Sequence, residues 1–241
     1  MLFLETVAAV PATGLFSLAW LLIVIPLAGA AILLLLGRHS DGWGHWLATA
    51  ASLASFTIGA LLFGMMLSAD EGHRAVTVPL YDWISAGSWT ISFGMLVDPL
   101  SILFVMLITG VGSLIHIYSI GYMRGNEEKN QTRFYVCFAI ALASAMGVAL
   151  SANLVTMFLF YEALTLSTYP LVAHKGDEKA RKGAAIYLGI LLGTSIGLLL
   201  PALSKVRKNA QQLKCGTNVR GIHQGLVNWA QGDNESYPIP S

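Results

Sequence analysis

The chain has 241 residues, of which 55% are hydrophobic and only 11% are charged. A soluble domain usually carries about 25% charged residues, and the mean hydropathy of this chain is +0.65. The net charge of +1 and the lack of a Gly-rich phosphate loop or metal-ligand cluster in the sequence argue against nucleic-acid, nucleotide or metal chemistry. We therefore expect a membrane protein without a bound cofactor or metal and without a nucleic-acid partner.

Six apolar stretches are long enough to cross a bilayer, because an uncharged run of about 18 or more residues is typical of a transmembrane helix. The predicted spans are residues 15–36, 46–68, 96–118, 134–150, 154–172 and 184–200. Glu5 is the only charge before the first stretch, where a cleaved signal peptide would have a basic segment, so we expect the first stretch to remain as a span. The fold class predicted is an all-α membrane protein.

A short β-hairpin is expected between the second and third spans. Residues 76–93 alternate apolar and polar side chains on either side of a turn at residues 85–87, which is typical of paired strands outside the bilayer. Pro79 cannot donate a ladder hydrogen bond, so it predicts that the first strand lies at an edge. Asp98 and Pro99 then suit the start of the third helix, where proline fits the first turn and an acidic side chain complements the dipole.

Charge in the loops predicts the orientation. Alternate loops place one group of basic residues on one side of the membrane: Arg38, Arg124, Lys129, Arg133, Lys175, Lys179, Arg181 and Lys182. The opposite side receives only Arg74 before the tail. By the positive-inside rule, we expect the first group in the cytoplasm and the N-terminus and hairpin outside. The tail, residues 201–241, is polar, partly helical by its apolar spacing, and also basic, which conflicts with the external position that six spans would give it.

Glu162 lies in the middle of the fifth apolar stretch. A charged side chain at the bilayer centre costs roughly 2.5–3.5 kcal/mol on insertion scales, so such residues usually face a bundle interior and mark an ion or proton path. The alternative is a protonated carboxyl with a structural hydrogen bond. Four hydroxyls within two turns can bond to the carboxyl or to water, or bond back to helix carbonyls. They belong to Tyr161, Thr165, Ser167 and Thr168.

Two further residues are candidates for proton transfer. His116 lies near the end of the third span, and an imidazole titrates near neutral pH, so it suits a proton relay. The alternative is a histidine that is interfacial or hydrogen-bonded without carrying protons. Asp98 lies at the opposite end of the same span, where capping of the helix competes with a role in proton entry.

Two segments resemble families that share a fold. Residues from about 15 to 123, above all VDPLSILFVMLITGVGSLIHIYSIGYM, resemble the N-terminal part of the large antiporter-like subunit of bacterial respiratory complex I. Residues from about 119 to 200, with FYEALTLSTYPLV, resemble the D subunits of Mrp-type cation/proton antiporters. The resemblance implies a multi-pass protein of the bacterial inner membrane. It also implies other membrane subunits as partners and H⁺ or Na⁺ as the transported ion.

The tail resembles a different family. Residues from about 197 to 240 are similar to the N-terminal helix of prepilin-like proteins of the type II secretion kind, although the prepilin cleavage site is absent. We therefore expect two domains, an antiporter-like transmembrane domain at residues 1–200 and a prepilin-like tail at residues 201–241, joined as a truncated chimera. A membrane-anchored pseudopilin-like structural protein and a fusion without activity are the alternative functions.

In the antiporter family, the glutamate that Glu162 matches pairs with a lysine on a later helix. This resemblance implies that Glu162 is one half of a proton-coupling charge pair, because a cation that moves toward or away from a carboxylate changes its affinity for a proton. Lys175 is about 20 Å further along a helix at 1.5 Å per residue, so it is not the direct partner. The chain is then at most a subunit of a proton-translocating NADH:quinone oxidoreductase, with no redox site of its own.

Overall fold

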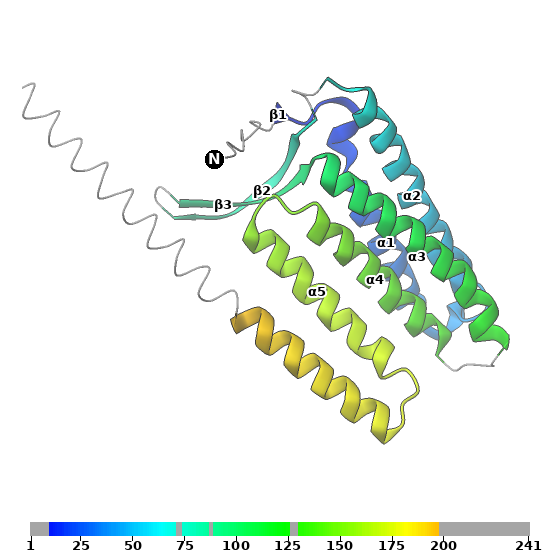
Figure 1. The fold of residues 1–241 in the computed structure, drawn as a ribbon. Coiled ribbons are helices and arrows are strands. Elements are labelled where there is room, and N and C mark those ends of the chain that lie inside the picture. The colour runs from blue at the N-terminus through cyan, green and yellow to red at the C-terminus, as the bar shows by residue number, and fades with distance from the viewer. Residues whose placement is uncertain (1–9, 71–73, 87–88, 126–129, 198–241) are drawn as a thin grey trace, which may run out of the picture. The chain divides into compact units, whose positions relative to one another are not determined.

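The computed structural model describes residues 10–70, 74–86, 89–125 and 130–197. Of the sequence predictions, the tail at residues 201–241 and the domain boundary that precedes it fall outside these residues. The chain divides into two compact units, of which the first, Met1–Leu192, contains the helices and strands that carry labels in Figure 1.

Helices form most of the first unit, as the composition predicts (Figure 1). In chain order the helices are η1 (Gly14–Leu18), α1 (Leu21–Leu36), η2 (Gly37–Ser40), α2 (Gly44–Ser68), α3 (Pro99–Gly125), α4 (Gln131–Ala149) and α5 (Leu154–Val172). In the part of the chain that the structure describes, five helical segments are long and apolar enough to cross a membrane. Residues 178–197 are also helical, and the predicted sixth span, residues 184–200, continues past the last described residue.

Two helices extend beyond their predicted bounds. α3 begins at Pro99, as Asp98 and Pro99 predicted, so Leu96 and Val97 of the predicted span at residues 96–118 belong to a strand instead. The predicted span also ends too soon, because α3 continues to Gly125. α4 begins at Gln131, before the predicted residue 134. Arg124 therefore lies in the last turn of α3 and Arg133 in the first turn of α4. Charged side chains in the end turns of a span can reach the membrane surface, which is why hydropathy alone ends α3 too early and begins α4 too late.

The predicted hairpin is present, and it is longer than expected. β2 (Val76–Ala86) and β3 (Trp89–Val97) pair in antiparallel fashion. A third strand, β1 (Val10–Pro11), pairs in parallel with the start of β2, so the sheet order is β1-β2-β3. The prediction that Pro79 confines the first strand to an edge is therefore wrong for the start of β2. Pro79 itself lies beyond the two β1 pairs and at an irregularity in the β2–β3 register, so it breaks no ladder to β1.

The sheet fixes the short link between α4 and α5. The backbone N–H of Leu96 donates to the carbonyl of Leu150 at 2.8 Å, and the N–H of Ala152 donates to the carbonyl of Gly94 at 3.1 Å. The link is as short as the sequence indicates, and α4 and α5 pack along each other as the antiparallel neighbours that were expected (Figure 1). The base of the hairpin thus sets where α5 starts.

The loops that carry basic residues lie together at the end of the bundle away from the sheet. Arg124 Nη2 donates to the carbonyl of Gly42 at 2.6 Å, and the N–H of Thr132 donates to Asp41 Oδ1 at 3.1 Å. Arg133 Nη2 donates to the carbonyl of His174 at 3.4 Å, just beyond the end of α5. The loops that the positive-inside rule assigned to one side therefore meet at one end of the fold.

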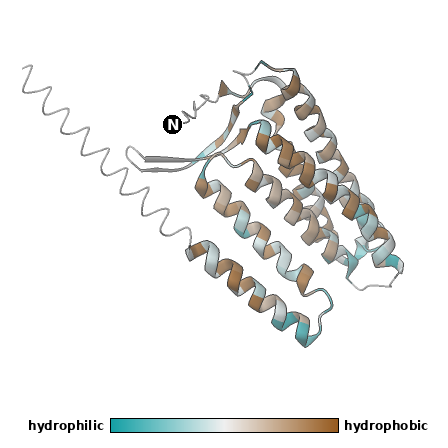
Figure 2. Cartoon of the chain, viewed as in Figure 1, coloured by the Kyte–Doolittle hydropathy of each residue, from teal (hydrophilic) through white to brown (hydrophobic). Residues whose placement is uncertain are grey.

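Apolar side chains lie on the outside of the bundle and polar ones inside, the reverse of a soluble helical bundle. Leu35 is 88% exposed and Leu114 is 67% exposed, whereas His116 is 0% exposed. Figure 2 shows apolar residues along most of the length of the helices, with hydrophilic residues concentrated toward the loops. Apolar side chains on the outside and polar ones inside suit a lipid surrounding. A multi-pass membrane protein is the architecture that follows.

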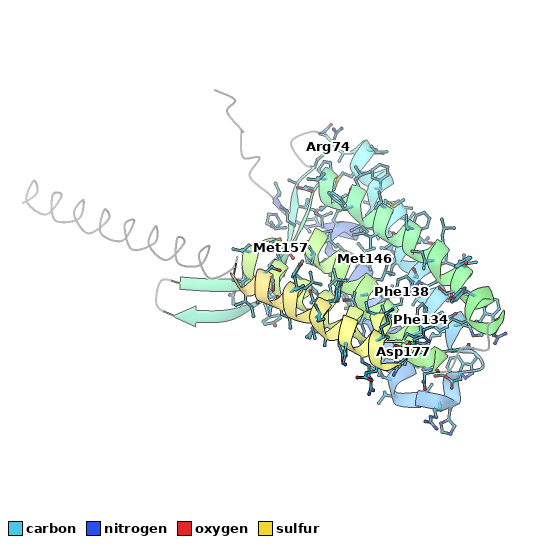
Figure 3. All side chains as sticks on the ribbon, turned by 60° about the horizontal axis from the view of Figure 1, so that its bottom comes forward. Arg74, Phe134, Phe138, Met146, Met157 and Asp177 are labelled. Carbon is cyan, nitrogen blue, oxygen red and sulfur yellow. The ribbon has the colours of Figure 1, made fainter. Side chains whose placement is uncertain are left out.

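Two apolar clusters occupy the two halves of the bundle. One lies toward the sheet and includes Leu22, Leu62, Val97, Ile102 and Met146. The other lies toward the basic loops and consists of Ala30, Leu33, Ala48, Tyr135, Val136 and Ala139. Figure 3 shows Phe134, Phe138 and Met146 in succession along α4, which contributes to both clusters, as α1 and α2 also do.

Candidate functional site

Glu162 lies near the middle of α5, as predicted. The bounds of α5 are those expected from the sequence, and its first turn is capped by Asn153, whose side chain accepts a hydrogen bond from the N–H of Thr156 at 2.9 Å. The Glu162 side chain is half-buried, and its Oε2 atom is buried. Glu162 lies roughly 12 Å from the start of α5, at 1.5 Å per residue. An apolar helix therefore carries a partly buried carboxyl group near its middle.

Three of the four hydroxyls near Glu162 hydrogen-bond to their own helix. Thr165 Oγ1 donates to the carbonyl of Tyr161 at 3.0 Å, Ser167 Oγ to that of Leu164 at 2.8 Å, and Thr168 Oγ1 to that of Thr165 at 2.8 Å. Serine and threonine commonly bond back to helix carbonyls in this way. For these three side chains the structure favours hydrogen bonds to helix carbonyls over hydrogen bonds to the carboxyl group or to water.

The basic residues at the end of the bundle are too far along α5 to pair directly with Glu162. Arg133 contacts the carbonyl of His174, which is twelve residues beyond Glu162, or roughly 18 Å along a helix. Lys175 is one residue further. The described helices therefore bring neither of these cations to the carboxyl group.

Asp98 has the hydrogen bonds of a helix cap. Its Oδ1 accepts from the N–H of Ser101 at 2.7 Å, and its own N–H donates to Ser101 Oγ at 2.8 Å. This reciprocal pair satisfies donors that the first turn of α3 would otherwise leave free. The geometry favours the capping role, and proton entry at Asp98 stays a prediction.

His116 is fully buried and lies deeper than predicted. Because α3 continues to Gly125, the histidine is nine residues, or roughly 14 Å, from the end of the helix. Its ring stacks on Phe138 of α4 with 4.4 Å between ring centroids, and its Nδ1 atom is 2.9 Å from the carbonyl oxygen of Gly112. The structure shows the hydrogen-bonded alternative, and a relay role for His116 stays a prediction.

The three predicted site residues do not form one site. Asp98 and His116 lie on the same helix, eighteen residues or roughly 27 Å apart. Glu162 is on α5, and α4 packs against both α3 and α5 (Figure 1). The structure instead brings His116 near Tyr135 of α4, which in turn lies near His45 of α2, and the sequence analysis missed both of these residues.

His45 and Tyr135 are as buried as His116. His45 is 2% exposed and Tyr135 is 1% exposed. The ring centroid of Tyr135 is 6.2 Å from that of His45 and 6.3 Å from that of His116. A signal was present in the sequence for α2, where polar residues recur at helical spacing from His45 through Thr49 and Ser52, on a face that proves to be buried.

Two family models match successive parts of the chain. Residues 83–135 match the N-terminus of chain 5 of NADH-ubiquinone oxidoreductase (complex I), and residues 151–232 match the transmembrane family of NADH:quinone oxidoreductase and Mrp antiporters. The second match contains Glu162 and extends over most of the tail predicted to be prepilin-like. That tail resemblance stays a prediction.

The curated relatives are also subunits of quinone oxidoreductases. The chain is 46% identical to subunit L of NADH-quinone oxidoreductase from Mycobacterium tuberculosis over 186 residues, which are 75% of this chain and 29% of the relative. It is 33% identical to chain 5 of NAD(P)H-quinone oxidoreductase from a Picosynechococcus species, over 70% of this chain and 26% of the relative. It is also 32% identical to subunit L from Escherichia coli, over 69% of this chain and 27% of the relative. The chain thus spans less than a third of the length of these relatives.

A solved structure shows the same fold. The membrane-bound sulfane sulfur reductase, an archaeal respiratory membrane complex, contains a chain that superposes with a TM-score of 0.61 at 22% identity, covering 76% of this chain and 36% of that chain. The family matches, the curated relatives and the fold agree with the resemblance that the sequence carries. This chain belongs to the family of antiporter-like membrane subunits that NADH:quinone oxidoreductase and Mrp antiporters share.

Proposed function

We propose that this chain is the N-terminal part of a proton- or cation-translocating antiporter-like subunit, and that Glu162 is its coupling carboxylate. The observation that carries the proposal is the buried Oε2 atom of Glu162 in the middle of α5, inside the segment that matches the antiporter transmembrane family. Intramembrane carboxylates generally mark ion or proton paths.

Partner helices supply the rest of the proposed site. The described part of α5 buries only Thr156, Thr165 and Ser167 and leaves Leu166 55% exposed, so one face of this helix is open to lipid or to further helices. We assign the cation that pairs with Glu162 to such helices, in the remaining two thirds of a full-length subunit or in a neighbouring subunit. The N-terminus and the hairpin are assigned to the outside of the bacterial inner membrane, and the basic loops to the cytoplasm.

Infrared spectroscopy of the chain in lipid bilayers tests the role of Glu162. The carboxylic-acid carbonyl band that the Glu162→Gln variant removes should appear and disappear reversibly with pH and should shift in D₂O, because a coupling carboxyl exchanges its proton. A band that persists at every pH and does not exchange would identify a structural, permanently protonated Glu162 and overturn the proposal. Glu178→Gln is the control, since Glu178 is exposed and forms a surface ion pair with Lys182 at 2.8 Å.

A flux measurement tests the incompleteness of the site. Because the partner cation belongs to other helices, liposomes that contain this chain alone should dissipate a pH or Na⁺ gradient no faster in the wild type than in the Glu162→Gln variant. Faster dissipation that depends on Glu162 would show that the chain holds a complete path. The pseudopilin-like alternative finds no support among the described residues.

A further inference from the structure

The geometry points to a second protonatable site, a buried water-binding cluster formed by His45, Tyr135 and His116. This cluster lies on α2, α3 and α4, apart from Glu162 on α5. We define these three residues as the His–Tyr cluster. It binds water and takes up a proton reversibly from the end of the bundle where the basic loops meet.

Hydrogen bonding fixes the proton acceptor on His116. A carbonyl oxygen only accepts hydrogen bonds, so the Nδ1 atom that lies 2.9 Å from the carbonyl of Gly112 must carry the hydrogen. In the neutral ring the Nε2 atom then has a lone pair and no hydrogen. Nε2 is buried and has no hydrogen-bond partner within the described part of the chain. It is therefore the atom that receives a proton.

Water completes the polar contacts of the cluster. Four of its atoms are buried without a hydrogen-bond partner in the described residues, namely His45 Nδ1, His45 Nε2, His116 Nε2 and Tyr135 Oη. Buried polar groups in native proteins are nearly always hydrogen-bonded, to ordered water where protein atoms do not serve, and a buried water makes about two to four such bonds. Four unpaired donors and acceptors in one place match what such water requires.

A pocket that can hold water lies at the same end of the bundle. A pocket of about 200 Å³ lies between α1 and α4, and its lining includes Leu33, Val136, Asp41 and Thr132. Water occupies about 30 Å³ per molecule in the liquid, so the pocket holds several. Leu33 and Val136 also pack in the apolar cluster that contains Tyr135. Two residues that line the pocket therefore belong to the same apolar cluster as Tyr135.

The polar interior ends halfway along the bundle. From the His–Tyr cluster, buried hydroxyls continue between α2 and α3, where Ser52 Oγ and Ser113 Oγ are 2.9 Å apart. Further toward the sheet, α2 and α3 bury Leu62, Ile102 and Val105 in the larger apolar cluster. The buried hydroxyls of Ser55 and Thr109 extend this polar stretch by about one turn, and beyond them a proton bound at His116 meets the larger apolar cluster. The site stores a proton and returns it to the side from which it came.

Several titratable or charged groups face this end of the bundle. They are Arg38 and His39 of η2, Asp41 after it, Arg124 of α3, Arg133 of α4 and His174 after α5. A bulk titration would mix all these groups, so protonation must be measured residue by residue.

Solid-state NMR of the full chain in lipid bilayers, labelled with ¹⁵N at its six histidines, makes this measurement. His45→Gln and His116→Gln assign the two ring signals. We expect polarisation from water to reach the His116 ring, and its ¹⁵N shifts to change from neutral to cationic as the pH is lowered below neutral. Tyr135→Phe removes a hydroxyl that holds water and should slow the transfer from water to the His116 ring by about twofold or more. Tyr118→Phe is the matched control, because Tyr118 is 71% exposed, and it should leave the transfer unchanged.

Three results would overturn the inference: a dry His116 ring, a wet ring that stays neutral at every pH at which the fold persists, or no effect of Tyr135→Phe. The inference rests on the proposed function only for the nature of the ion. The Glu162→Gln variant separates the two, because the His–Tyr cluster should still take up its proton in that variant. Failure of the Glu162 infrared test would leave this result unaffected.

Discussion

Asn153 joins α5 to the β-hairpin through one side chain. Its Nδ2 atom donates to the carbonyl of Ser92 in β3 at 2.7 Å, and its Oδ1 atom accepts from the N–H of Thr156 in the first turn of α5 at 2.9 Å. One amide group therefore both caps the helix and ties it to the sheet. The position of Glu162 along the bundle axis depends on this contact, because Glu162 is nine residues further along the same rigid helix.

Replacement of Asn153 should weaken the fold where α5 begins. In Asn153→Ala both hydrogen bonds are lost, and loss of a cap alone costs about 0.5–2 kcal/mol. The remaining carbonyl of Ser92 also loses a donor. We expect a lower free energy of unfolding, measured by denaturant titration in detergent micelles.

Asn153→Asp separates the two contributions. An aspartate still accepts from the N–H of Thr156, but it has no N–H group to donate to Ser92. We expect this variant to retain the helicity of α5 while losing the tie to the sheet, which hydrogen–deuterium exchange at the α4–α5 link would report. Equal stability of the wild type and both variants would show that the contact contributes nothing to the fold.

Gly147 should tolerate no side chain. A Cβ atom at this position of α4 would overlap the ring of Phe160 on α5, so the two helices approach each other through the glycine. Gly147→Ala must move the ring or separate the helices, and overpacking of this kind typically costs about 1–3 kcal/mol. We expect the same denaturant titration to show a loss of stability in this range.

A second glycine gives the matched control. Gly121 lies in α3 with no atom within 4 Å of the position that a Cβ would occupy. Gly121→Ala should be neutral or should stabilise the chain by up to about 1 kcal/mol, because alanine favours a helix over glycine. Adding Phe160→Leu to Gly147→Ala should recover part of the lost stability. If Gly147→Ala has the same effect on the free energy of unfolding as Gly121→Ala, then α4 and α5 do not approach each other closely at Gly147.

The sequence predicted the helices well where apolar runs end at clear stop signals. α5 has the predicted bounds because Asn153 caps one end and the other end meets the polar residues after Val172. α3 differed because hydropathy does not distinguish the apolar end of β3 from the start of a span. The hydrogen bonds of Asp98 to Ser101 mark the true boundary. β1 was not predicted, since two paired residues leave no periodic pattern.

The sequence located single site residues but not their neighbours. Glu162 and His116 stand out as ionisable groups in apolar runs, which a sequence shows directly. The approach of His45 and Tyr135 to His116 depends on how α2, α3 and α4 pack, and Tyr135 alone in an apolar stretch gives no signal of its partners. Placement of the two histidines around one tyrosine is a tertiary property, so only the structure could provide it.

The last prediction concerns orientation in the membrane. The positive-inside rule favours the cytoplasm for both the basic loops and the basic tail, whereas six spans place them on opposite sides. Six crossings from an external N-terminus place Cys215 outside the cell, although the tail carries basic residues that favour the cytoplasm. In a Cys137→Ala background, a membrane-impermeant maleimide should therefore label Cys215 from the external side of sealed vesicles. The control is His39→Cys with Cys215→Ala, which places the only thiol in η2 and should react from the opposite side only. If Cys215 and the thiol of this control variant react from the same side, the stretch at residues 184–200 does not cross the membrane, and the chain has five spans.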